Sequence, residues 1–130
     1  MQRAIYLLSP RPNWIYPYKS PNSQKRRFCE KLEIEVVKNL SNPDFQIEDL
    51  CRTMMMSRTH LYRQIKQHFG SSFTDILTTT RIRRSSDLLL HSSKSISEIC
   101  YECGFRDPSY FVRVFRKKTG LTPKAFRNNF

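Results

Sequence analysis

Glycine, acidic residues and long apolar runs are all scarce in this chain. Only 3 of the 130 residues are glycine, which excludes a glycine-rich loop that cradles a phosphate group. The longest purely apolar stretches, such as residues 4–8 and 88–90, are far too short to cross a bilayer, and no signal peptide is visible. We therefore expect a cytoplasmic protein without a membrane partner.

Aspartate and glutamate number only 11, against 23 lysines and arginines, so the formal net charge is +12. A positive field of this size attracts polyanions, either nucleic acid or anionic lipid. Because no membrane segment accompanies the charge, nucleic acid is the favoured partner. The length suits one compact domain with its own core, and a second domain is not expected.

Cysteine is present but lacks the spacing of a metal site. A basic chain without an export signal belongs in a reducing compartment, so the thiols of Cys29, Cys51, Cys100 and Cys103 should be free. The last two form a CxxC pair, but structural zinc needs four ligands, and the three histidines are not spaced to supply the others. No catalytic triad or paired-carboxylate site is recognisable. We expect no enzyme activity, metal, cofactor or small-molecule ligand.

The most informative pattern is an internal repeat at a separation of about fifty residues. Residues 47–51, Ile-Glu-Asp-Leu-Cys, match residues 96–100, Ile-Ser-Glu-Ile-Cys. The later matches are Ser57 with Asp107, Leu61 with Phe111, Arg63 with Arg113, Ile65 with Phe115, Gly70 with Gly120 and Ser72 with Thr122. The second copy has one extra residue in its turn. Since a repeat marks positions built for the same task, the helices that carry Arg63 and Arg113 should act alike.

Apolar residues at helical spacing predict an all-α fold of about seven helices. The first helix is amphipathic, because its apolar residues recur at every fourth position: Phe28, Leu32, Val36 and Leu40. The expected N-caps are Ser57, Ser72, Asp107 and Thr122, and the expected helix stops are Gly70 and Gly120. No strand pattern competes with this interpretation.

The repeat and the helices together define the organisation of the chain. Residues 1–22 carry four prolines with aromatic residues between them and no acidic residue, so we expect a poorly ordered tail or the stub of a linker. Residues 23–130 form the expected domain. Its first helix-turn-helix unit covers about 46–70, a long linker helix about 72–91, and a second helix-turn-helix unit about 95–119.

The second helix of each unit has the side chains needed to contact DNA. In a helix-turn-helix this helix enters the major groove, so it needs one apolar face and one long-armed polar face. The expected base-reading residues are Thr59, Tyr62 and Arg63 in the first unit and Ser109, Val112 and Arg113 in the second. The expected phosphate contacts are Arg58, Lys66, Arg106, Arg116 and Lys117.

Two other interpretations of the basic residues remain open. A single exposed arginine is most often a solvated surface charge, and only the matched positions of Arg63 and Arg113 favour contact with DNA. Arginines of the linker helix and the C-terminus, such as Arg81 and Arg127, are equally consistent with ion pairs to residues such as Asp87 or Glu98.

The run from Ile96 to Lys117, followed by residues 120–127, closely resembles the signature of the AraC/XylS family of bacterial transcription regulators. The resemblance covers about residues 28–127. It implies a seven-helix domain in which two recognition helices enter successive major-groove segments on one DNA face. It also implies a cytoplasmic, nucleoid-associated regulator that usually activates transcription by engaging RNA polymerase. The family's base-reading positions fall on the same six residues as above.

The chain also resembles the output domains of Bacteroides-type hybrid two-component regulators. No sensor domain fits before Phe28, so we expect either a fragment of a larger regulator or a stand-alone regulator. One departure from the family is the stretch Met54-Met55-Met56, where a glycine is common, because a non-glycine residue at positive φ costs on the order of 1 kcal/mol. The alternative function is a non-specific nucleic-acid or protein-binding module from a truncated regulator.

Overall fold

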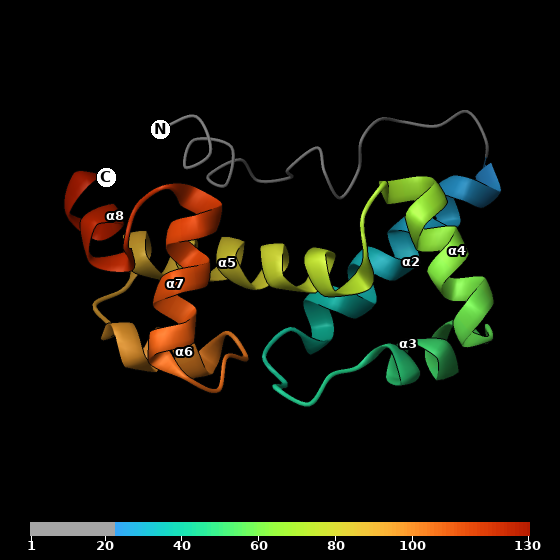
Figure 1. Ribbon diagram of the computed structural model, residues 1–130, viewed down its shortest axis with the longest axis horizontal. Coiled ribbons are helices and arrows are strands. Elements are labelled where there is room, and N and C mark those ends of the chain that lie inside the picture. Colours follow the sequence, from blue (N-terminus) through green and yellow to red (C-terminus); the bar gives the residue numbers. More distant parts are fainter. Residues whose placement is uncertain (1–22) are drawn as a thin grey trace.

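The computed structural model describes residues 23–130, and the expected tail at residues 1–22 lies outside this range. Within it the chain forms seven helices and no strand, which confirms the predicted all-α class (Figure 1). The helices are α2 (Ser23–Asn39), α3 (Ile47–Met54), α4 (Arg58–Phe69), α5 (Phe73–His91), α6 (Ile96–Glu102), α7 (Pro108–Thr119) and α8 (Pro123–Asn129).

The long helix α5 runs through the middle of the molecule and joins two helical units (Figure 1). Helices α2, α3 and α4 lie around one end of α5, and α6, α7 and α8 lie around the other. Each unit has its own hydrophobic core, whereas the length of the chain predicts a single core. Phe73, Ile76 and Leu77 of α5 belong to the first core, whereas Ile82 and Leu89 belong to the second. The change of core between residues 77 and 82 divides α5 between the two units.

The helix boundaries follow from capping within the sequence. Five N-cap side chains accept a hydrogen bond from the backbone amide three residues later: Ser57, Ser72, Ser95, Asp107 and Thr122. Each such bond satisfies one of the amides that a helix start leaves without a partner. Four of these caps were predicted, and Ser95 was not. Gly70 and Gly120 end α4 and α7 in the left-handed region, as expected.

The turns inside the two units have matching backbone structure. The Met56 amide donates to the Cys51 carbonyl and the Phe105 amide to the Cys100 carbonyl, each at 3.1 Å. The residue before each amide has a positive φ, which is 54° at Met55 and 85° at Gly104. Met55 therefore takes the position of a turn glycine, as the departure from the family pattern indicated.

Two arginines hold the ends of α2 and α5, and for both of them the open alternative of an ion pair with Asp87 or Glu98 gives way to bonds with backbone carbonyls. Arg81 Nε donates to the Leu40 carbonyl at 2.8 Å, and Arg127 Nε donates to the Leu89 carbonyl at 3.0 Å. Leu40 and Leu89 stand at equivalent places in the repeat. The carbonyl groups at a helix end lack partners within the helix, so an arginine from another helix satisfies them.

Candidate nucleic-acid interface

Helix α4 has one buried side and one exposed side. Leu61 and Ile65 are buried in the first core. The predicted base-reading residues Thr59, Tyr62 and Arg63 are all exposed on this helix, and so is Lys66. This division follows from helical spacing, because residues three or four positions apart share a side of the helix.

Helix α7 repeats the arrangement in the second unit. Phe111 and Phe115 are fully buried, and their rings pack edge to face at a centroid distance of 5.8 Å. Ser109 and Arg113 are exposed, as are Arg116 and Lys117, whereas Val112 is half-buried. Val112 can therefore offer a methyl-sized apolar contact but no hydrogen bond. The matched arginines of the repeat occupy matched, exposed places on two matched helices.

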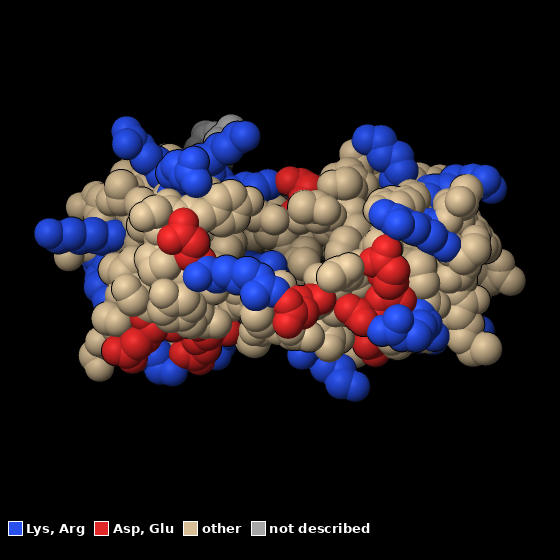
Figure 2. All heavy atoms as spheres, turned by 60° about the horizontal axis from the view of Figure 1, so that its bottom comes forward, with Lys and Arg blue, Asp and Glu red and all other residues tan. Residues whose placement is uncertain are grey.

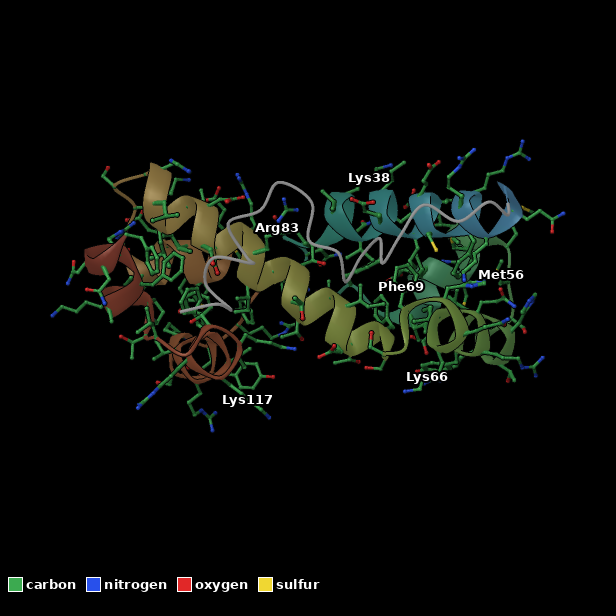
Figure 3. The ribbon with its side chains drawn as sticks, turned by 90° about the horizontal axis from the view of Figure 1, so that it is seen from above. Lys38, Met56, Lys66, Phe69, Arg83 and Lys117 are labelled. Carbon is green, nitrogen blue, oxygen red and sulfur yellow. The ribbon has the colours of Figure 1, made fainter. Side chains whose placement is uncertain are left out.

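The two helices lie on the same side of α5. In Figure 1 both α4 and α7 rise in the same direction across the front of the molecule. Figure 3 shows Lys66 of α4 and Lys117 of α7 on the side of α5 that faces away from Lys38 of α2. Arg63 and Arg113 precede these lysines by about one helical turn, so they belong to the same side. A single rod-shaped ligand can thus lie across both helices.

Arg58, a predicted phosphate contact, already has partners within the first unit. Its guanidinium lies 3.2 Å from the Glu48 carboxylate, donates to the Tyr62 hydroxyl at 3.3 Å, and stacks over the Tyr62 ring at 5.5 Å. The hydrogen bond from Arg58 to Tyr62 is the main reason that the pKa of Arg58 is raised above its usual value. Arg58 therefore holds Tyr62 in position on the exposed side of α4.

Sequence reasoning missed Tyr110, which supports Arg113. The guanidinium carbon of Arg113 lies 5.7 Å from the centroid of the Tyr110 ring, within the range of a cation–π contact. The Tyr110 ring in turn lies beside the ring of the buried Phe105, with 6.4 Å between the two ring centroids. The signal was available in the sequence, because a tyrosine three residues before an arginine shares its side of a helix. For Arg63, the described part of the chain provides no such aromatic partner.

Three other basic side chains at this interface make contacts of their own. Lys66 Nζ donates to the Gly70 carbonyl at 3.2 Å, and Lys118 pairs with Asp75 of α5 at 2.6 Å. Arg106 forms an ion pair with Asp44, across the two units. Exposed pairs of this kind contribute about 0–1 kcal/mol, so they orient a side chain more than they stabilise the fold.

Charge is unevenly spread over the surface. Figure 2, in which the lower side of Figure 1 comes forward, shows lysine and arginine side chains at both ends of the molecule, and basic and acidic side chains side by side near its middle and lower edge. Two of the basic residues, Arg58 and Arg106, form ion pairs with the acidic residues Glu48 and Asp44. These carboxylates offset part of the positive charge near the two turns.

The cysteines are not arranged as a reactive or metal-binding site. Cys100 and Cys103 are fully buried as free thiols, and burial raises the pKa of Cys103 to about 12. Between residues 23 and 130, no group of three or more His, Cys, Asp or Glu side chains is placed to hold a metal ion. Within the same range, every helix is too short or too polar to span a bilayer.

Comparison with known proteins gives consistent results. A family model described as a helix-turn-helix domain matches residues 50–129. Over 108 residues the chain is 32% identical to the HTH-type transcriptional activator RhaR of Escherichia coli (strain K12). This alignment covers 83% of the present chain but only 38% of RhaR, so the chain spans well under half the length of that relative.

Two solved structures share the fold at somewhat lower identity. The C-terminal domain of AraT, a response regulator from Geobacillus stearothermophilus, is 28% identical with a TM-score of 0.75, over 86% of this chain and 89% of that one. The DNA-binding domain of AdpA, a global transcriptional factor solved in complex with a target DNA, is 29% identical with a TM-score of 0.72. That match covers 77% of this chain and 89% of the AdpA chain.

Proposed function

The chain belongs to the AraC/XylS family of helix-turn-helix transcription regulators, and on this premise we propose that it binds one specific double-stranded DNA site through α4 and α7 together. Each helix enters one of two successive major-groove segments, which are about 34 Å apart on one face of B-DNA. The observation that carries the proposal is the position of α4 and α7, which rise in the same direction on one side of α5 (Figure 1).

Base reading centres on the matched arginines. A guanidinium donates two hydrogen bonds to O6 and N7 of guanine, and such a pair discriminates against the wrong base by about 1–3 kcal/mol. Thr59 and Tyr62 flank Arg63, and Ser109 and Val112 flank Arg113, with Val112 suited to a thymine methyl group. The stacking of Arg113 on Tyr110 reduces the conformational freedom that the arginine loses on binding.

Phosphate contacts come from the basic residues around these two helices. The residues that we assign to this role are Arg58, Lys66, Arg106, Arg116 and Lys117. Arg58 and Arg106 each pair with an exposed carboxylate, so we expect a phosphate to replace or share that partner. Such contacts fix the register of the protein on DNA without reading its sequence.

The regulator acts in the cytoplasm, on the nucleoid, as an activator that contacts RNA polymerase. Support for this part of the proposal is the similarity to RhaR, which is named a transcriptional activator. The family is one of DNA-binding regulators and not of enzymes.

In vitro selection of a binding site, followed by a competition gel shift at fixed salt, tests the proposal. A specific complex survives a large excess of random DNA, whereas an electrostatic complex is competed away and fades steeply as salt rises. The second outcome would instead support a non-specific nucleic-acid-binding module.

Two substitutions test which residues contact the bases. Arg113→Ala should weaken binding by about 1–3 kcal/mol and relax base preference in one half of the site, and Arg63→Ala should do the same in the other half. Lys124→Ala, which removes an exposed positive charge from α8, is the matched control and should leave base preference unchanged. Unchanged preference in both arginine variants would refute the assignment.

A further inference from the structure

A direct contact between the two units surrounds the middle of α5. We call this contact the seam; it comprises Leu40, Asn42 and Asp44 from the loop between α2 and α3, Gly104, Phe105 and Arg106 from the turn between α6 and α7, and Arg81 from α5. Figure 1 shows the loop and the turn side by side below α5. Residues about sixty positions apart in the sequence thus meet at one place.

Arg81 bonds to the first unit through two backbone carbonyls. Its Nε donates to the Leu40 carbonyl and its Nη2 to the Asn42 carbonyl, both at 2.8 Å. The guanidinium is a planar donor with several N–H groups in fixed geometry, so it can hold both oxygens at once. A lysine at this position has one compact ammonium group and cannot reproduce that geometry.

The same guanidinium packs against the turn of the second unit. Its carbon lies 6.0 Å from the centroid of the Phe105 ring. A Cβ atom built on Gly104 would lie 2.1 Å from the Leu40 carbonyl oxygen and 2.9 Å from Arg81 Nε. The backbone of the turn therefore rests directly on both groups, and only a glycine leaves room for this approach. The ion pair of Arg106 with Asp44 crosses the same boundary.

Besides the seam, α5 itself and the ion pair of Lys118 on α7 with Asp75 connect the two units in the described part of the chain. Their cores are separate, and the segment of α5 between them carries the hydroxyl of Thr80, which donates to the Ile76 carbonyl at 2.7 Å. Ser85 and Ser86 both donate to the Ile82 carbonyl a turn later. Side-chain bonds of this type compete with the helix ladder and favour bending. Three such bonds lie near the junction, so contacts outside α5 help to fix how the two units are oriented.

We infer that Arg81, clamped between the Leu40 and Asn42 carbonyls and the Gly104–Phe105 turn, is the positioning residue that fixes the separation of α4 and α7 and thereby the spacing between the two half-sites in DNA. This inference rests on the proposed function, since half-site spacing has meaning only if both helices bind one DNA. Rigid coupling between the units lets the second half-site bind with a high effective concentration, but only when its spacing fits.

The test measures binding to a series of duplexes in which the two selected half-sites are moved apart or together by single base pairs. The unchanged protein should prefer one spacing by about tenfold or more, a typical coupling between two sites. Arg81→Met, which keeps the aliphatic stem but removes both donors, should lower that preference to about threefold or less while changing affinity for either half-site alone by no more than about twofold. Arg81→Lys should fall between the two.

The matched control is Arg84→Met, which removes the same charge from an exposed position on the same helix. It should keep the spacing preference of the unchanged protein. Asp44→Ala, which breaks only the exposed ion pair with Arg106, provides a second variant that does not disturb the buried part of the seam. It should relax the preference by a smaller factor than Arg81→Met. A spacing preference in Arg81→Met equal to that of the control would overturn the inference.

A measurement without DNA separates this inference from the proposed function. Spin labels introduced as non-canonical residues at Gln67 of α4 and Lys117 of α7, which are equivalent positions, report the distance between the two helices. The distance distribution should be narrow in the unchanged protein and broader in Arg81→Met. If the distribution stays narrow, Arg81 does not position the units, whatever the DNA experiments show. If it broadens while no specific site exists, the proposed function fails and the structural role of Arg81 stands.

Discussion

Replacing Met55 by glycine should stabilise the protein, although it removes a side chain. Met55 ends α3 with φ at 54° and ψ at 46°, in the left-handed region that L-residues enter at a cost. Its side chain is 89% exposed, so it contributes little packing. Gly104 holds the equivalent position in the second unit. Met55→Gly would give the first turn the residue that the second turn already has.

The size of the effect follows from two opposing contributions. The left-handed conformation costs a non-glycine residue about 1–2 kcal/mol, which the glycine recovers. The glycine also gives the unfolded chain more conformational freedom, which opposes folding by about 0.4–1 kcal/mol. The free energy of unfolding should therefore rise by about 0.5–1 kcal/mol. For a domain of this size, that change raises Tm by about 3–6 °C.

The equivalent substitution in the second unit should have the opposite sign and a larger magnitude. Gly104→Ala keeps the positive φ, at a cost of about 1–2 kcal/mol, and forces a Cβ atom against the Leu40 carbonyl oxygen. Overpacking adds about 1–3 kcal/mol, so the expected loss is about 2–5 kcal/mol. The difference between the two substitutions measures the effect of the neighbouring atoms, because both residues have a positive φ.

Urea unfolding followed by far-ultraviolet circular dichroism measures both changes. Met55→Ala is the control, since it removes the methionine side chain but keeps a Cβ atom at positive φ. Its free energy of unfolding should stay within about 0.5 kcal/mol of the unchanged protein. The reasoning is refuted if Met55→Gly leaves the unfolding midpoint unchanged or lowers it. It is also refuted if Met55→Ala stabilises as much as Met55→Gly, because backbone strain would then not be the cause.

Three further expectations concern charge and thiol chemistry. Lys117→Ala should weaken binding to all DNA sequences alike and lower the salt slope of affinity by about one unit, as gel shifts at several salt concentrations would show; altered base preference would instead make Lys117 a base reader. At neutral pH a thiol reagent should modify the half-buried Cys51 before the buried Cys29, Cys100 and Cys103, and mass mapping that finds Cys103 first would contradict the structure. Burial raises the pKa of Cys103 from its ordinary 9.0 to about 12, so above pH 9 the unfolded thiol ionises while the folded one stays protonated. The free energy of unfolding should therefore fall as pH rises from 9 towards 12, by up to about 1.4 kcal/mol per pH unit from this group. Urea titrations of Cys103→Ala should show a shallower fall, and an equal slope would exclude Cys103 as the source.

The helices and the exposed sides of α4 and α7 were predictable because they depend on short-range relations. A cap such as Ser57 bonds to an amide three residues away, and the burial of Leu61 and Ile65 follows the helical period. The duplication extended the argument, since it matched Arg63 with Arg113. The contact of Tyr110 with Arg113 could have been predicted in the same way, because the two residues are three positions apart on one helix.

The partners of Arg81 could not be predicted from short-range relations in the sequence. Ion pairing and carbonyl capping were both open to an arginine on the linker helix, and the choice depends on the Leu40 and Asn42 carbonyls, 41 and 39 positions away. The ion pairs of Arg58 and Arg106 were equally unpredictable, because the carboxylate partner of each arginine lies in another element of the fold.

The amino-acid order alone determined the helices, four of their N-caps and the exposed and buried sides of α4 and α7, since each of these arises from hydrogen bonds and spacings that span three or four residues. Only the folded chain decided that α4 and α7 rise on one side of α5 and that Arg81 joins two units across the seam (Figure 1). Contacts between segments about forty to sixty residues apart depend on which helices pack together, and the apolar period shows that a face is buried but not which helix buries it.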